Sequence, residues 1–389
     1  MEFPDNAETE FRMQVRTFAA RHAAQHAGPP PTLGDRAAVQ SWTTALDRQG
    51  WLVPHWPADA GGRSWSALRH YVLREELCAP ERPEVDTIGL QLVGPLLARF
   101  GSVEQKQRYL PRIRGAADLW CQGFSEPDCG SDLTRIRTTA RAAPGGYVVD
   151  GHKVWITNAH LADRMMVLVR VRDDRTTQPG HTLLLLDMHS PGVTVRPITT
   201  IDSRHTINEV TLSQVAVPQA DLVGEEGHAW TYAAWCLVKE RIMAAQIPRL
   251  GYDLERLGRL NASRGGRDPR WDCEAFVTLQ WLPARMEFLA CRFLMLRLLE
   301  LPEADESAGA LAAVLKVAGT ELAQKVIELT MELLGEAGLV SSRQDSAFPG
   351  ICAAQILEVQ REFLFSRARS IAAGTSEIQR NIVAALTLF

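Results

Sequence analysis

The sequence predicts three regions in order: a helical N-terminal part, a β-rich middle part and a helical C-terminal part. Two observations lead to this prediction. Apolar residues recur at helical spacing on both sides of the middle, whereas short runs rich in β-branched residues fill about 118–217. The length agrees, because 389 residues suffice for two or three domains.

The N-terminal part, residues 6 to about 115, has the apolar periodicity of helices. Phe11, Val15 and Phe18 share one helical face. Gly50 is a helix stop, and Ser102 is a helix start. The stretch 50–62, rich in Pro, Gly and Trp, is expected to be a loop.

The middle part is predicted to hold five or six antiparallel strands that close into a small barrel or sandwich. Asp150–Gly151 lies between two apolar runs and predicts a hairpin turn there. The further strand candidates are 165–171, 182–186, 193–198 and 209–217.

The C-terminal part is helical after Gly224–Gly227. Between 306 and 335 one apolar stripe predicts a helix that packs into a bundle or an interface between subunits. The stripe consists of Leu311, Leu315, Ala318, Leu322, Val326, Leu329 and Leu333.

The composition excludes several classes of protein. A net charge of −4 argues against a nucleic-acid partner, and no apolar run is long enough to span a membrane. The acidic N-terminus lacks a signal-peptide core. Seven scattered cysteines without metal-ligand spacing predict reduced thiols in a cytoplasmic protein, and no metal site.

The segment Trp120–Leu133, WCQGFSEPDCGSDL, carries the strongest chemical signal and is called the first motif here. It offers two hydroxyls, on Ser125 and Ser131, and a glycine, Gly130, where backbone can approach a ligand. Turns of this kind bind anions through backbone N–H groups. From these residues alone, a phosphate loop and an ordinary polar turn both remain open.

Six segments in the same order resemble the acyl-CoA dehydrogenase family of flavoproteins. The resemblance implies a helical N-terminal domain (1–117), a middle antiparallel β-domain (118–222) and a C-terminal four-helix bundle (223–389). The last segment, AGTSEIQRNIVA at 373–384, is called the second motif. The others are GWLVPHWPADAGG (50–62), FGSVEQKQRYLPRI (100–113), the first motif, GHKVWITNA (151–159) and INEVTLSQVAVPQADLVGEEG (207–227).

The resemblance implies FAD as cofactor. It places Trp155 against the flavin ring and the Thr157 hydroxyl near flavin N5. The alternatives for these two residues are a buried strand aromatic and a strand-end hydroxyl. The other residues that it places on FAD are Gln122, Phe124, Ser125, Gly130, Ser131, Thr375 and Glu377.

The family removes an α-proton from an acyl thioester by a carboxylate base, whose pKa apolar surroundings raise. The usual base precedes the Gly-Thr of the second motif, where this chain has Ala373, so the resemblance is to a subgroup without that glutamate. Some members carry the base on an earlier helix, and the matching residue is Glu240, followed by Arg241 as a substrate contact. The alternatives are a solvated helix glutamate, and Glu255 as the base.

The resemblance therefore implies FAD-dependent α,β-dehydrogenation of an acyl-CoA or an acyl group on a carrier protein, with an electron-transferring flavoprotein as acceptor. It also implies a homodimer or homotetramer. Two segments that usually contact the neighbour's FAD, 263–268 and 332–336, depart from the family pattern. They leave two alternatives: a degenerate subunit of a hetero-oligomer, and a flavin monooxygenase or oxidase on the same fold.

Overall fold

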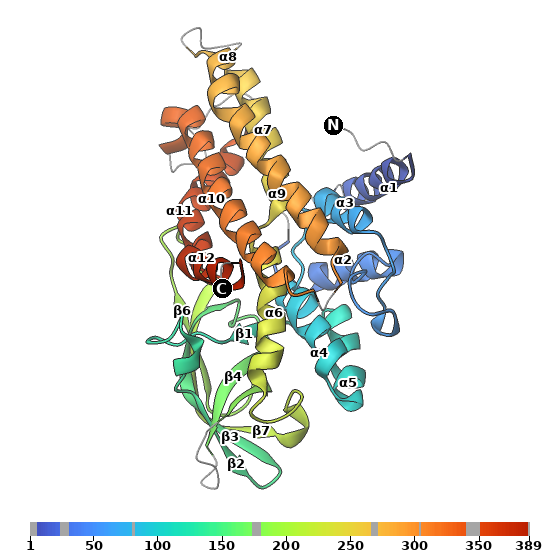
Figure 1. The fold of residues 1–389 in the computed structure, drawn as a ribbon, viewed down its shortest axis with the longest axis vertical. Helices are drawn as coiled ribbons and strands as arrows, with labels where there is room; N and C mark the ends of the chain where they lie inside the picture. The colour runs from blue at the N-terminus through green and yellow to red at the C-terminus, as the bar shows by residue number, and fades with distance from the viewer. Residues whose placement is uncertain are drawn as a thin grey trace.

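The computed structural model describes residues 6–23, 31–79, 82–172, 180–265, 271–302, 305–339 and 351–387. Figure 1 shows the N-terminal helices on one side of the molecule, the C-terminal helices on the other, and the sheet at one end. The long helix α6 leads from the sheet into the C-terminal helices, so it borders all three regions (Figure 1).

The N-terminal helices begin and end at local signals that the sequence contains. Gly50 ends α2 with a left-handed φ of 71°, and Ser102 and Gln105 form a capping box at the start of α5. A π-helical turn, η2, runs directly into α4. The elements are α1 (Asn6–Ala23), α2 (Arg36–Gln49), η1 (Ala58–Ala60), α3 (Ala67–Leu77), η2 (Gly89–Val93), α4 (Gly94–Phe100) and α5 (Val103–Arg114).

The middle region is one curled sheet of seven described strands, in the order β1-β4-β2-β3-β7-β6, with β5 paired to β4. Most pairings are antiparallel, as predicted, whereas β1 and β2 each pair with β4 in parallel. The strands are β1 (Trp120–Gly123), β2 (Thr139–Ala143), β3 (Gly146–Thr157), β4 (Arg164–Arg172), β5 (His181–Asp187), β6 (Val193–Ile198) and β7 (Ile207–Pro218), with 3₁₀ turns η3 (Leu133–Arg135) and η4 (Gln219–Asp221).

The predicted hairpin at Asp150–Gly151 is wrong. Strand β3 continues through these residues, and its register against β7 shifts there, which is a β-bulge. The hairpin turn lies earlier, between β2 and β3, where Gly145 has a φ of 83°. A Cβ on Gly151 would lie 2.3 Å from the Thr138 hydroxyl, so glycine is needed there for close packing within the sheet.

Helix α10 is the centre of the C-terminal region and packs against α6, α7, α9, α11 and α12. Leu315, Leu322 and Leu329 are buried in the core of the chain itself, so the predicted stripe serves the bundle and not an interface. The elements are α6 (Ala229–Ala244), α7 (Ile247–Gly265), α8 (Cys273–Phe276), η5 (Val277–Trp281), α9 (Leu282–Glu300), α10 (Ala308–Leu334), η6 (Gly335–Leu339), α11 (Ala353–Arg369) and α12 (Ser376–Thr387).

Candidate functional site

A buried ion pair attaches the first motif to strand β3. The Lys153 ammonium donates to the Glu126 carboxylate at 2.9 Å and to the Phe124 carbonyl at 3.1 Å. Glu126 also accepts the backbone N–H groups of Arg137 and Thr138, at 2.6 and 2.9 Å. Burial alone would raise the pKa of Glu126, but Lys153 and these hydrogen bonds hold it below the usual value. These contacts therefore hold the loop of the first motif in place against the rest of the protein.

The same attachment brings Ser125 beside Trp155. The Val154 N–H donates to the Ser125 carbonyl at 3.0 Å. Trp155 follows with a φ of 63° at a second register shift in β3, and 63% of its surface is exposed. The alternative, a buried strand aromatic, is therefore excluded, because most of the Trp155 side chain is exposed. Thr157, at the end of β3, is exposed as well.

The turn of the first motif leaves room for a ligand. Glu126 and Cys129 exchange backbone hydrogen bonds of 2.9 and 3.0 Å, and Gly130 and Ser131 follow on the surface. A Cβ built on Gly130 would meet no protein atom within 4 Å. The protein's own packing does not require glycine there, whereas close approach of a ligand to the backbone would.

The second motif is a sharp turn capped onto α12. Ala373 and Gly374 both have left-handed φ angles, 56° and 82°. The Thr375 hydroxyl accepts the Ile378 N–H at 3.2 Å, which caps the helix. Glu377 is exposed in the first turn, and hydrogen bonds from its own backbone N–H and from Thr375 lower its pKa. Both predicted residues thus lie at the positive end of α12.

A buried lysine that sequence reasoning missed holds this turn. Lys316, on α10, has no exposed surface and donates to the Gly374 carbonyl at 2.8 Å. Burial lowers its pKa to about 8, against the opposing effect of Glu321, Glu377 and Glu240. A lysine inside the apolar stripe of 306–335 is the sequence signal that could have identified it.

Glu240, the candidate base, lies on α6 and is half-buried. Burial raises its pKa, while a hydrogen bond with Gln122 and the charges of Arg241 and Lys316 act in the opposite direction. The structure therefore brings Glu240 next to Gln122 of the first motif and near Lys316, which holds the second motif. A carboxylate with a raised pKa binds a proton more strongly than a solvated one does, which is the property that a general base needs.

The remaining candidate residues are Arg241, Phe124 and Glu255. Arg241 is half-buried, and burial lowers its pKa. Phe124 is 4% exposed, so its side chain belongs to the core and only its backbone can meet a ligand. Glu255 is exposed on α7 and pairs with Arg285, which is the arrangement of a surface ion pair and not of a base.

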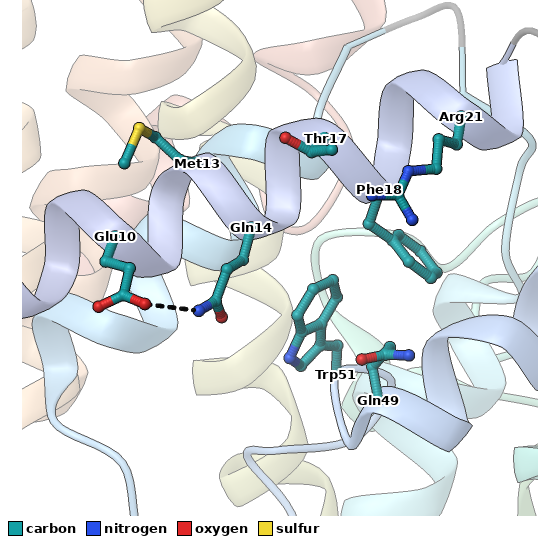
Figure 2. A pocket seen from close by; sticks show the side chains of 8 residues that line it. All are labelled: Glu10, Met13, Gln14, Thr17, Phe18, Arg21, Gln49 and Trp51. Atoms are coloured by element: carbon teal, nitrogen blue, oxygen red, sulfur yellow. Dashed lines mark hydrogen bonds between the residues drawn. The ribbon is translucent and has the colours of Figure 1, made fainter.

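A separate hollow lies on the N-terminal helices. Figure 2 shows Phe18, Gln49 and Trp51 facing it from α1 and the end of α2, with Glu10 and Gln14 joined by a 3.3 Å hydrogen bond along α1. Its volume is about 460 Å³, and none of the residues predicted to bind FAD lines it. It forms no part of the candidate site.

Three family models match nearly the whole chain. They describe the acyl-CoA dehydrogenase N-terminal domain (residues 5–116), middle domain (121–215) and C-terminal domain (227–388). The chain is 32% identical over 385 residues to the acyl-CoA dehydrogenase IpdE1 of Mycobacterium tuberculosis, covering 96% of each protein. None of the described helices is both long and apolar enough to cross a membrane.

Two solved structures of protein pairs are also similar. The Tcur3481-Tcur3483 steroid ACAD aligns with a TM-score of 0.82 at 26% identity, covering 100% of this chain and 99% of that one. The ChsE4-ChsE5 complex from Mycobacterium tuberculosis aligns with a TM-score of 0.79 at 25% identity, covering 100% and 98%.

Proposed function

The chain belongs to the acyl-CoA dehydrogenase family of oxidoreductases, which act on CH–CH donors, and we propose that it oxidises an acyl thioester at Cα–Cβ with FAD and with Glu240 as the base. One observation carries the proposal. Glu240 is the carboxylate that contacts Gln122 and lies near Lys316, while the position before Gly374 holds Ala373.

The described residues fit a flavin dinucleotide. An exposed indole at Trp155 offers a flat apolar surface to the ring, and the open room at Gly130 suits the close approach of a pyrophosphate. When bound, FAD supplies the acceptor for the hydride that leaves the β-carbon. The residues that would hold it are Gln122, Ser125, Gly130, Ser131, Trp155, Thr157, Thr375 and Glu377, with Phe124 contributing its backbone.

Glu240 performs the proton step. As the carboxylate, it accepts the α-proton of the thioester, and its burial favours the neutral acid that results. The charges of Arg241 and Lys316 oppose the rise in the pKa of Glu240 that burial causes. General-base catalysis of this kind is most effective when the pKa of the base is raised toward the working pH.

We also propose that the active form is an oligomer with a second family member or a second copy. Helix α9 and the preceding turn expose apolar side chains at a heptad-like spacing, which suits a helix-packing interface. Both similar structures are named as pairs of proteins, which supports a hetero-oligomer as an alternative to a homo-oligomer. The exposed residues are Leu279, Leu282, Met286 and Phe293.

The decisive experiment is anaerobic flavin reduction by a panel of acyl thioesters. Glu240→Gln keeps shape and hydrogen bonding but cannot accept the proton, so we expect at least about a 100-fold slower reduction with FAD still bound. In the parent the rate should rise with pH as Glu240 loses its proton, and Glu240→Gln should lack that rise.

Glu255→Gln is the matched control and should reduce its flavin at the parent rate. Full activity of Glu240→Gln would overturn the assignment of the base. If the parent bleaches only after a homologous partner is added, and Glu240→Gln does so equally fast, the chain is a degenerate subunit. Flavin that reacts with oxygen to hydroxylate the substrate would indicate a monooxygenase instead.

A further inference from the structure

Asn208, near the start of β7, is a buried amide that the proposed reaction does not use. It has no exposed surface. Its amide nitrogen donates to the Ile156 carbonyl of β3 at 3.0 Å and lies 3.2 Å from the His160 Nδ1. Its amide oxygen lies 2.7 Å from the His205 Nε2. One side chain therefore joins β3, the turn that follows β3 and the segment that precedes β7.

The backbone that Asn208 contacts has two uncommon conformations. Trp155 and Asn158 have φ angles of 63° and 56°, in the left-handed region that residues other than glycine rarely adopt. Between them, Ile156 resumes pairing with Asn208 after the register shift in β3. Such conformations cost energy and persist only where neighbouring contacts hold them. Two such contacts are the Asn208–Ile156 hydrogen bond and the Asn158 N–H, which donates to the Thr206 carbonyl at 2.7 Å.

The two side chains proposed to meet the flavin stand on this stretch. Trp155 and Thr157 are exposed, whereas Ile156 between them is buried in the core of the sheet region. The Ile156 carbonyl belongs to the peptide group that joins Ile156 to Thr157, so the hydrogen bond from Asn208 fixes how that group is turned. A buried carbonyl needs such a partner. Asn208 therefore acts on the exposed side chains through the backbone.

Two stacked histidines decide which way the Asn208 amide points. The rings of His160 and His205 lie 4.0 Å apart between their centres, at an angle of 24°. The amide nitrogen can donate to both Ile156 and His160 only if the His160 Nδ1 carries no proton. A proton there would face the amide N–H groups, and turning the amide around would place its oxygen against the Ile156 carbonyl. The network is therefore complete only while His160 is neutral.

The surroundings of His160 favour the neutral ring. Partial burial and then the charge of His205 lower the pKa of His160 from its ordinary 6.5. A hydrogen bond with Asn208 would raise this pKa only if the amide oxygen faced His160, whereas that oxygen faces His205. The other charged groups nearby are engaged with one another. They are Arg204 with Asp202, Glu358 and Glu362, Asp163 with Arg36 and His189, and Glu209 with His152 and its cross-strand neighbour Arg196.

We propose that Asn208 is a positioning residue for Trp155 and Thr157, and that protonation of His160 turns the amide and loosens the FAD site. This inference rests on the proposed function, because the site is the one proposed for FAD. The ordered site keeps His160 neutral, so it binds fewer protons than the loosened site does. FAD affinity should therefore fall as the pH drops below about 6.5, the ordinary value for the ring.

The test uses FAD titration of the apoprotein and, without FAD, backbone hydrogen exchange of residues 154–160 followed by mass spectrometry. At pH 7.5, Asn208→Ala should weaken FAD binding at least about tenfold and speed exchange in this segment, because the buried Ile156 carbonyl loses its donor. Asn208→Asp keeps the shape without the donor and should behave similarly. The melting transition of each apoprotein shows whether it folds.

The pH dependence is tested separately with His160→Gln, an exposed change that offers a neutral acceptor. Between pH 7.5 and 5 the FAD affinity of the parent should fall at least about threefold, whereas that of His160→Gln should stay nearly constant. His152→Gln is the matched control, since His152 is an exposed histidine of β3 whose partner is Glu209, 3.7 Å away. It should keep the affinity of the parent and its pH dependence.

Unchanged FAD affinity or unchanged exchange in a folded Asn208→Ala protein would overturn the positioning role. If both Asn208 variants fail to fold, the parent and His160→Gln still decide, because acid dependence that survives in His160→Gln overturns the proposal. If the parent binds no FAD while Asn208→Ala still speeds exchange at 154–160, the proposed function fails and the positioning of this segment by Asn208 stands.

Discussion

The first and second motifs are each held by a lysine with no exposed surface, but the two lysines are balanced differently. Lys153 is paired with a carboxylate, Glu126, at 2.9 Å. Lys316 donates instead to a neutral carbonyl, that of Gly374, at 2.8 Å, and carboxylates act on it only as neighbours. The buried cation of the first motif is therefore compensated by a direct partner, and that of the second is not.

The two lysines differ in how directly a carboxylate balances their buried charge. Burial lowers the pKa of both lysines, but Glu126 opposes this at Lys153 through its charge and a direct hydrogen bond, whereas the carboxylates near Lys316 act only through their charge. Lys316 also acts on Glu240, so its charge affects the proposed base as well as the turn. We infer that the first motif is a rigid support and that the second is electrostatically coupled to the proton step.

The largest effect on stability is expected from Lys153→Met. The substitution leaves the Glu126 carboxylate buried without its cation, and breaking such a pair costs about 3–5 kcal/mol. Chemical denaturation of the apoprotein measures the loss. The double variant with Glu126→Gln removes the stranded charge and should recover part of it. A loss below about 1 kcal/mol in the single variant would show that the pair does not hold the loop.

Lys316→Met should cost less, within about 1 kcal/mol at pH 7, because it removes a hydrogen bond and a poorly balanced buried charge together. The folded pKa of Lys316, about 8, lies below its ordinary 10.5. Between these values the unfolded chain binds the extra proton, so the parent gains stability with rising pH relative to Lys316→Met.

Melting temperatures of the parent and of Lys316→Met, measured from pH 7 to 10, test this window. The parent should gain on the variant above about pH 8. A difference that stays constant over that range would mean that folding does not lower the pKa of Lys316, and it would contradict the prediction.

The smallest effect is expected from Ser131→Ala in the first motif. Ser131 is exposed and supports none of the loop's own contacts, so the fold should keep its stability. Loss of one hydrogen bond to the pyrophosphate should weaken FAD retention by about 1 kcal/mol, roughly fivefold. Gel filtration followed by the flavin-to-protein absorbance ratio measures it. Thr134→Ala, exposed in the same loop, is the control, and equal losses in both variants would contradict a specific contact.

The sequence by itself determined the order of helices, strands and helices, and several of the ends of those elements. Gly50 and Ser102 end and begin helices as predicted, because capping depends on residues within one turn. The position of Glu240 on a helix could also be predicted, because neighbouring segments resemble the family pattern. These are local properties, or comparisons with a known pattern.

Only the tertiary structure decided which charges are buried and what balances them. Lys153 meets Glu126 across 27 positions of sequence, and Lys316 meets Gly374 across 58. Asp150–Gly151 is a bulge because β7 pairs along the whole of β3, a contact that the dipeptide cannot encode. Turn propensity and periodicity report on neighbours in the chain, whereas register, burial and the pKa of a buried group depend on residues that folding brings together.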